Sequence, residues 1–404
     1  MINHHHNSFK WDQVRSHNSL PIVELSAITT AGISAARSII YKSDSVRLRQ
    51  LWTAEFGITI DWAARHAITS IATPCVHNLS NGDLLLRSSG DTSLCRLDNS
   101  IIFSPGHEVF MPSNQTLIFP RSETVINEAL DATSFRNNNY YYDFTAYKEI
   151  EHVGVPVFLL SSRWSSRNYY HWMVDCVPKI SFYKALREQI RSLKILLLEP
   201  HDHSFHREFI QGIGIEQQDI ITLKNRSASI QSLYFMPRIG PDSHSRDLSI
   251  AQKQVLSQLL TGAPSHRRLF VMRRPGTERS LANHSEVQKL LSSMGFHCTY
   301  LEQHKLEEQI SLVTSAHVIV GPHGAGLTLA GLSLEPDFPK RVIEITHVEP
   351  FNPCFLYNSQ ASGSLSHSIL PSKKLWSPGK PAMIRVDTTM LSTLLEVACQ
   401  EELY

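Results

Sequence analysis

Residues 317–332, HVIVGPHGAGLTLAGL, place an apolar strand before a glycine-rich turn and an apolar helix. The strand is expected to end at Gly321 and Pro322, so that residues 323–326 form the loop. Small residues let a backbone approach an anion closely, and the N–H groups at a helix start attract phosphate. The spacing is neither that of the dinucleotide fingerprint nor that of the P-loop. A tight strand-to-helix connection without a ligand explains the pattern about equally well, but His323 adds an imidazole able to donate to a phosphate oxygen or a sugar hydroxyl.

The segments on both sides of this loop alternate between strand and helix patterns. Strands are predicted at 267–274, 297–302 and 341–345, and helices at 250–260, 283–295, 306–316 and 389–403. A similar series precedes it, with strands predicted at 155–162, 193–200, 219–223 and 232–237 and helices at 169–189 and 203–214. Such alternation predicts βαβ units and mostly parallel sheets. The expected fold class is therefore α/β, with two doubly wound, Rossmann-like domains facing a cleft.

The turn-rich stretch 237–249 lacks hydrophobic periodicity and is the predicted linker. We expect an N-terminal region over 1–240, with a Rossmann-like core at about 150–240, and a second Rossmann-like domain over 241–404 that ends in a helix. Before residue 150 the patterns are weaker. Residues 45–67 suggest a helix, and residues 82–91 and 114–122 suggest strands.

The composition is that of a soluble globular protein. The 404 residues are 42% hydrophobic and 19% charged, and the formal net charge is +1, so nothing global indicates nucleic acid or an anionic membrane as a partner. Six scattered cysteines without a CxxC pair predict free thiols and a reducing compartment. The sequence shows no secretory signal and no membrane-spanning segment, so we expect a cytoplasmic protein, with membrane association limited to its periphery.

Two arginines stand at the carboxyl end of a predicted strand. Arg273 and Arg274 lie where ligands bind in open α/β sheets, and Arg279 follows in the loop. Guanidinium groups bind phosphate oxygens in pairs and stay charged, which favours diphosphate binding over a merely solvated surface loop. Asn283, three residues before Glu286, has the spacing of a helix capping box.

A histidine and an aspartate share one helix face in NYYHWMVDCVPK, residues 168–179. His171 and Asp175 are four residues apart, so both side chains project together. A structural pair is the commoner explanation, and a general-base pair is the functional one. Either residue could take the proton; the ordinary pKa of histidine, about 6.5, suits a base better than that of aspartate, about 3.9.

A metal site is the rival interpretation of HDHSFH, residues 201–206, whose HxH spacing and aspartate resemble hydrolase ligands. No second cluster of histidines and carboxylates accompanies it. We therefore expect surface or capping roles for His201, Asp202, His203 and His206.

Four segments in this order, 168–179, 267–287, 306–328 and 341–345, resemble glycosyltransferase family 61, which includes capsular-polysaccharide enzymes of the DUF563 type. The resemblance implies a GT-B architecture and an inverting transfer from a nucleotide-sugar, usually UDP-linked, to a glycan or polysaccharide hydroxyl, without a metal or other cofactor. The stretch LSLEPDFPK, residues 332–340, departs from the shorter Pro-Gly turn of the family.

The resemblance also implies roles for single residues. The C-terminal domain would hold the donor, with Arg273 or Arg274 and the backbone of Gly324, Ala325 and Gly326 neutralising the diphosphate. Glu344 would accept hydrogen bonds from the ribose hydroxyls. His171 and Asp175 would face the acceptor from the N-terminal domain.

Two other classes of function stay open at this point. One is a catalytically silent nucleotide- or sugar-binding protein with the same architecture, and the other is a phosphosugar transferase. The expected partners are a nucleotide-sugar and a glycan acceptor, with no nucleic acid.

Overall fold

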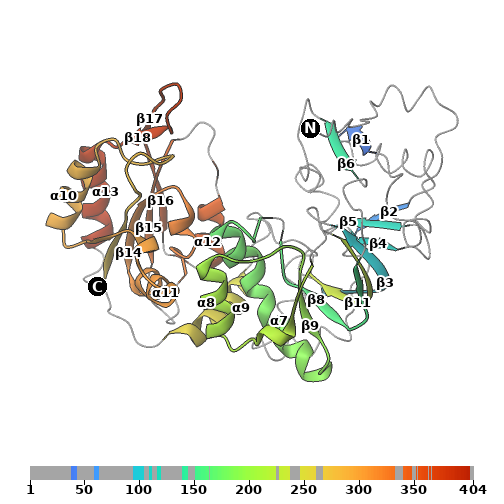
Figure 1. Cartoon of the computed structure of the whole chain (residues 1–404). Coiled ribbons are helices and arrows are strands. Elements are labelled where there is room, and N and C mark those ends of the chain that lie inside the picture. The colour runs from blue at the N-terminus through green and yellow to red at the C-terminus, as the bar shows by residue number, and fades with distance from the viewer. Residues whose placement is uncertain are drawn as a thin grey trace. The chain divides into compact units, whose positions relative to one another are not determined.

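The computed structural model describes most of the chain after residue 150 and short strands before it (Figure 1). The described residues are 38–42, 59–62, 94–103, 109–111, 116–119, 139–143, 151–162, 164–223, 227–236, 246–260, 267–332, 340–347, 352, 354–362, 364 and 366–400.

The chain forms two compact units, described separately below. The first comprises residues 1–167, 182–203 and 216–238, and the second comprises 168–181, 204–215 and 239–404. The boundary at 238 lies next to the division predicted from the sequence at 240. Residues 168–181 and 204–215, which precede that division, group with the second unit.

The second unit is built on a five-stranded parallel sheet. Its strands, in spatial order, are β13 (His297–Thr299), β12 (Arg268–Val271), β14 (Val318–Pro322), β15 (Arg341–Thr346) and β16 (Ser366–Pro371). Along the chain this is the doubly wound order 2-1-3-4-5. The strand order reverses between β12 and β14, and ligands of such sheets bind outside the carboxyl ends of the two strands at that point.

Helices cover both faces of this sheet and complete the second unit. They are α6 (Tyr169–His171), the π-helical turn η6 (Trp172–Cys176), α8 (Ser204–Gly212), α9 (Arg246–Leu256), η9 (Ser257–Leu259), α10 (His284–Ser293), η10 (Leu301–Gln303), α11 (Leu306–Ser315), η11 (Ala325–Leu327), α12 (Cys354–Ser362) and α13 (Thr388–Gln400). A small hairpin of β17 (Lys373–Leu375) and β18 (Met383–Arg385) follows β16.

In the second unit, successive side chains of each strand point to opposite faces of the sheet, and one of these faces forms the core. α10 and α13 lie side by side on one face of the sheet (Figure 1). Alternate strand residues on that face form the core with the two helices: Phe270, Met272, Val318, Val320, Ile343 and Ile345. The residues between them in sequence point to the opposite face. Val271, Gly321 and Glu344 are among these.

The first unit contains a nine-stranded mixed sheet. Its parallel part, in spatial order, consists of β10 (Ile220–Thr222), β9 (Lys194–Leu197), β8 (Val157–Leu159) and β11 (Ser227–Phe235). The sheet continues through β3 (Cys95–Phe103), β4 (Val109–Met111), β5 (Thr116–Phe119) and β2 (Thr59–Trp62), while β7 (Glu151–Val153) also pairs with β11. This unit also contains η7 (Gln217–Asp219) and a separate pair of β1 (Ser38–Lys42) with β6 (Asn139–Asp143). The unit boundary falls within α7 (Val177–Gln189).

The α/β class predicted from the sequence is confirmed, and so are the elements predicted after residue 155 except the helix expected after the glycine loop. The predicted helix at 169–189 is interrupted by the π-turn, a feature frequent at functional sites. The predicted strand at 114–122 is present as β5, whereas residues 82–91 lie outside the described residues. Within the predicted linker, α9 begins at Arg246, and residues 237–245 lie outside the described residues. Cys176, Cys298, Cys354 and Cys399 are free thiols, as expected.

Three local expectations were wrong. The helical pattern of residues 45–67 contains β2, which pairs with β5, so sheet pairing overrides local periodicity there. The glycine loop leads into the three-residue η11 and further turns instead of a full helix. Asn283 begins α10 without a capping bond, because both ends of its amide bind the backbone of Val386 at 3.0 and 3.1 Å.

Replacing a core residue of α13 tests the packing of the second unit. Leu395 is fully buried, whereas Val397 on the same helix is 57% exposed. Leu395→Ala is expected to lower the free energy of unfolding by about 2–5 kcal/mol, because it leaves a cavity. Val397→Ala is the control and is expected to change it by less than about 0.5 kcal/mol. Urea titration followed by circular dichroism measures both, and equal effects would contradict the assigned core.

Candidate functional site

Arg273 and His323 meet at the point where the strand order reverses. Arg273 follows β12, His323 follows β14, and the guanidinium Nη1 donates to the carbonyl oxygen of His323 at 3.2 Å. Burial and the nearby Arg279 lower the pKa of Arg273 from its ordinary value. A guanidinium stays charged despite such a shift, so this edge of the sheet holds a partly desolvated positive charge.

The glycines of the loop make room for this arginine and for β12. A Cβ atom on Gly324 would lie 2.1 Å from Nη1 of Arg273, and one on Gly326 would lie 2.6 Å from a methyl carbon of Val271. Since η11 is only three residues long, no helix dipole points at the site. The glycine loop therefore acts here chiefly by permitting close packing.

The structure separates the three arginines predicted for the donor. Arg274 is exposed and donates to Glu302 through Nε at 2.8 Å, so its charge is balanced at the surface. Arg279 has a positive φ of 62° and is held by its N–H, which donates to the carbonyl of Ala382 at 2.6 Å. Its electrostatic contact is with Arg273. Arg273 and Arg279 are therefore electrostatic neighbours, while Arg274 lies in an exposed ion pair.

Glu344 lies in the middle of a buried hydrogen-bonded chain. Its Oε1 accepts from Nδ1 of His323, and its Oε2 accepts from Nε2 of His367 at 2.9 Å. Nδ1 of His367 in turn lies 2.7 Å from the hydroxyl oxygen of Ser359 on α12. The carboxylate side chain is 0% exposed, and the two histidine side chains are 8% and 2% exposed. Both carboxylate oxygens, for which the family resemblance implies hydrogen bonds from ribose hydroxyls, accept from imidazoles here.

The hydrogen bonds from the two histidines favour the ionised form of Glu344. Burial alone would raise its pKa, but the hydrogen bonds from His323 and His367 outweigh burial and hold the pKa below the ordinary value. An ionised Glu344 fixes Nδ1 of His323 as a donor, which leaves Nε2 of that ring to interact with a ligand. The arrangement resembles the carboxylate that orients a catalytic imidazole.

Two further basic residues lie near this edge and were missed from the sequence. His347 follows β15, and its pKa is lowered by burial and by the positive charges of Lys374 and Arg279. Lys374 belongs to β17. Applying the strand-end rule to β15 would have singled out His347. The position of Lys374 depends on the β17–β18 hairpin, whose connection to the loop at 279–282 is a tertiary contact.

His171 and Asp175 form the predicted pair. Nδ1 of His171 donates to Oδ2 of Asp175 at 3.0 Å, and their side chains are 16% and 1% exposed. The pair lies on the last residues of α6 and on η6, in the second unit. The Asp175 carboxylate therefore orients the His171 ring, as in the second arrangement considered from the sequence.

An aromatic contact connects the two histidine–carboxylate pairs. The ring of Tyr170, next to His171, packs edge-on against Phe355 of α12 at a centroid distance of 5.5 Å. Phe355 packs against His323 at 4.8 Å. Both pairs therefore belong to one continuous packed region of the second unit.

The residues of the rival metal motif do not gather around a common centre. His201 is buried and lies 2.9 Å from the hydroxyl oxygen of Ser165, and His206 is buried against Trp172 at a ring distance of 4.7 Å. Of the surface or capping roles expected for the four residues, a surface position is wrong for His201 and His206, which are buried, whereas Asp202 and His203 are exposed. Among the residues that the structure describes, no group of three or more His, Cys, Asp or Glu side chains is placed to hold a metal ion.

The fold and this site define an α/β protein with a cationic, histidine-containing site at the carboxyl edge of a parallel sheet. Residues 169–333 match the family Glycosyltransferase 61, and this match supports the resemblance seen in the sequence. The match supports a glycosyltransferase as the class of the protein. No curated protein matches the chain. In the described part of the chain, no helix combines the length and apolarity needed to cross a bilayer.

The pH dependence of stability tests the buried chain around Glu344. Because its folded-state pKa lies below the ordinary value of 4.5, the ionised carboxylate stabilises the fold fully above pH 4.5. That stabilisation is lost as the pH falls through the lowered pKa. Glu344→Gln is expected to cost about 1–3 kcal/mol at pH 7, and the difference from wild type should shrink below pH 4.5.

Urea titrations at several pH values measure this difference. Glu396→Gln on the exposed side of α13 is the matched control, expected to change stability by less than about 0.5 kcal/mol throughout. A Glu344→Gln penalty that stays constant to pH 3 would show that the carboxylate charge is not the stabilising feature.

Proposed function

We propose that this glycosyltransferase inverts the anomeric centre as it moves a sugar from a nucleotide diphosphate donor, UDP-linked by preference, to a glycan hydroxyl. The two units would serve as the two domains of a GT-B enzyme, and synthesis of a capsular or other polysaccharide in the cytoplasm is the proposed setting. The cationic edge between β12 and β14 is the observation that carries the proposal.

The leaving diphosphate needs positive charge that is already in place. Arg273, Arg279 and Lys374 supply fixed charges around the strand ends, and Arg273 is held beside His323 by its hydrogen bond to the carbonyl oxygen of that residue. Preorganised donors of this kind stabilise developing negative charge most strongly in a partly desolvated site. They perform electrostatically the task that a divalent cation performs in other transferases, so we propose that activity does not require a metal.

The acceptor hydroxyl must lose its proton during transfer. We assign this step to Nε2 of His171, because Nδ1 of that ring is bound to Asp175. The Asp175 carboxylate stabilises the imidazolium that forms, and general-base assistance of this type contributes about 10²–10⁴-fold. The proton then leaves His171 to solvent after the product dissociates.

Two other functions use the same cationic edge. A silent nucleotide-binding protein would bind UDP without turnover, and a phosphosugar transferase would release the nucleoside monophosphate instead of the diphosphate. Incubation with a panel of UDP- and GDP-sugars, with and without EDTA, separates the three. Nucleoside diphosphate released in the presence of EDTA supports the proposal, whereas strict dependence on a divalent ion contradicts the assigned arginine cradle.

The two neighbouring arginines give a matched test of the donor site. Arg273→Ala is expected to weaken UDP binding at least tenfold in calorimetry, because it removes the partly buried charge beside His323. Arg274→Ala is the control and is expected to change the affinity less than threefold, since Arg274 is paired with Glu302 at the surface. Equal losses of affinity, or a larger loss for Arg274→Ala, would contradict the placement of the diphosphate beside His323.

Substitution of the His171–Asp175 pair tests the base. His171→Ala and Asp175→Asn are expected to lower kcat at least 100-fold while the dissociation constant for UDP changes less than threefold. His304→Ala is the control, because His304 likewise pairs with a carboxylate four residues later, at 3.3 Å from Glu308. Loss of UDP affinity in the two test variants would assign the pair to the donor instead of the acceptor.

A further inference from the structure

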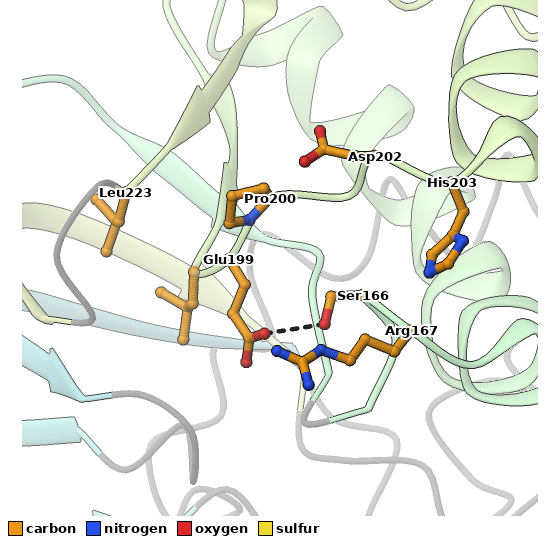
Figure 2. A pocket seen from close by; sticks show the side chains of 8 residues that line it. Ser166, Arg167, Glu199, Pro200, Asp202, His203 and Leu223 are labelled. Carbon is orange, nitrogen blue, oxygen red and sulfur yellow. Dashed lines mark hydrogen bonds between the residues drawn. The ribbon is translucent and has the colours of Figure 1, made fainter.

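A hollow of about 470 Å³ lies in the first unit, formed by loops that follow the parallel strands β8, β9 and β10 (Figure 2). It is lined by Ser166, Arg167, Leu198, Glu199, Pro200, Asp202, His203 and Leu223. The carboxyl ends of parallel strands are where open α/β sheets bind their ligands. None of the residues assigned above to nucleotide binding or proton transfer lines this hollow.

Buried hydrogen bonds hold the two main loops of the hollow together. Ser165 Oγ lies 2.9 Å from Nε2 of His201, and Nδ1 of that ring donates to the carbonyl oxygen of Glu199 at 2.8 Å. The hydroxyl of Ser166 donates to Oε2 of Glu199 at 2.9 Å, and Ser161 Oγ accepts from the N–H of Leu198 at 3.2 Å. The loop after β8 and the loop after β9 are therefore joined by hydrogen bonds that need no ligand, as expected of a preformed site.

The polar groups of the lining suit hydroxyl groups. The carboxylates of Glu199 and Asp202 accept hydrogen bonds, and the guanidinium of Arg167 donates them. Arg167 is exposed, and its guanidinium makes no hydrogen bond or ion pair within the described residues, although Figure 2 shows it directed towards Glu199. Pro200 is exposed and provides apolar surface for the C–H face of a sugar ring, whereas Leu198 and Leu223 lie beneath the hollow and are each 1% exposed.

The charge of the lining disfavours sugars that carry a negative charge. Two carboxylates stand against one guanidinium, so the hollow disfavours a ligand that carries its own carboxylate or phosphate. This is the opposite of the cationic edge in the second unit, where Arg273, Arg279 and Lys374 favour an anion.

We propose that this hollow is a sugar-binding subsite for a neutral, hydroxyl-rich residue and that it discriminates against uronic acids and phosphorylated sugars. Glu199 and Asp202 accept from sugar hydroxyls, and Arg167 donates to a hydroxyl or ring oxygen. That the bound residue is part of the acceptor glycan rests on the proposed function; the binding of a neutral sugar does not.

Saturation-transfer NMR on the full chain tests the subsite with defined probes. Methyl glucoside, methyl galactoside and methyl xyloside serve as neutral sugars, and methyl glucuronide serves as the anionic counterpart of methyl glucoside. At least one neutral probe is expected to bind at least tenfold more tightly than methyl glucuronide. Absence of binding by all three neutral probes, or a preference for the glucuronide, would overturn the proposal.

Variants assign the binding to this hollow. Asp202→Asn and Arg167→Ala are each expected to weaken binding of the neutral probe at least fivefold, and Asp202→Asn should also narrow the discrimination against the glucuronide. Arg167→Ala removes no described side-chain contact, so it tests the site even if another variant folds poorly. Glu188→Gln, an exposed acid on α7 in the same unit, is the control and should change nothing. Unchanged binding in both pocket variants would place the sugar elsewhere.

Donor turnover distinguishes this proposal from the function on which its acceptor role rests. The pocket variants are expected to keep wild-type hydrolysis of the nucleotide-sugar while KM for the glycan acceptor rises at least fivefold. An unchanged acceptor KM would overturn the acceptor role. If wild type turned over no nucleotide-sugar but still bound neutral sugars through Arg167 and Asp202, the proposed function would fail and the subsite would stand.

Discussion

The buried carboxylate of Glu344 constrains how β14, β15, β16 and α12 pack together in the second unit. A charge with no exposed surface is costly unless it is paired and hydrogen-bonded, and Glu344 meets this requirement with two imidazoles. His323 follows β14 and His367 lies in β16. Both hydrogen bonds to Glu344 can form only if β14 and β16 are correctly aligned on the two sides of β15. Ser359 extends the requirement to α12. A shift of any of these elements would leave a charge or an imidazole unsatisfied in the interior.

The same constraint orients the chemistry at the sheet edge. Glu344 holds Nδ1 of His323, while the backbone carbonyl of His323 accepts from Arg273, which packs against Gly324. Phe355 then packs between His323 and Tyr170, next to the His171–Asp175 pair. Two histidine–carboxylate pairs thus occupy one unit, one beside arginines and the other on a π-helical turn. Their surroundings differ in charge, as the proposed leaving-group site and the proposed base would require.

Charge also distinguishes the two candidate sites from each other. The second unit gathers arginine, lysine and histidine at its strand ends, whereas the hollow in the first unit has more carboxylates than guanidinium groups. The formal net charge of +1 conceals this difference. A donor with a diphosphate and an acceptor rich in hydroxyl groups would have opposite requirements of this kind.

Patterns of residues close together in the chain indicated the α/β class, the elements after residue 155 other than the helix after the glycine loop, the His171–Asp175 pairing and the basic strand end. Four separate motifs together indicated the resemblance to glycosyltransferase family 61. Only the tertiary structure separated Arg273 from Arg274, since the partners that distinguish them, His323 and Glu302, come from distant segments. It also revealed that both oxygens of Glu344 bind histidines, that Asn283 binds Val386 and that residues 59–62 join a sheet. Local periodicity reports which face of an element is apolar, but burial, ion pairing and strand pairing depend on which distant segments pack against it.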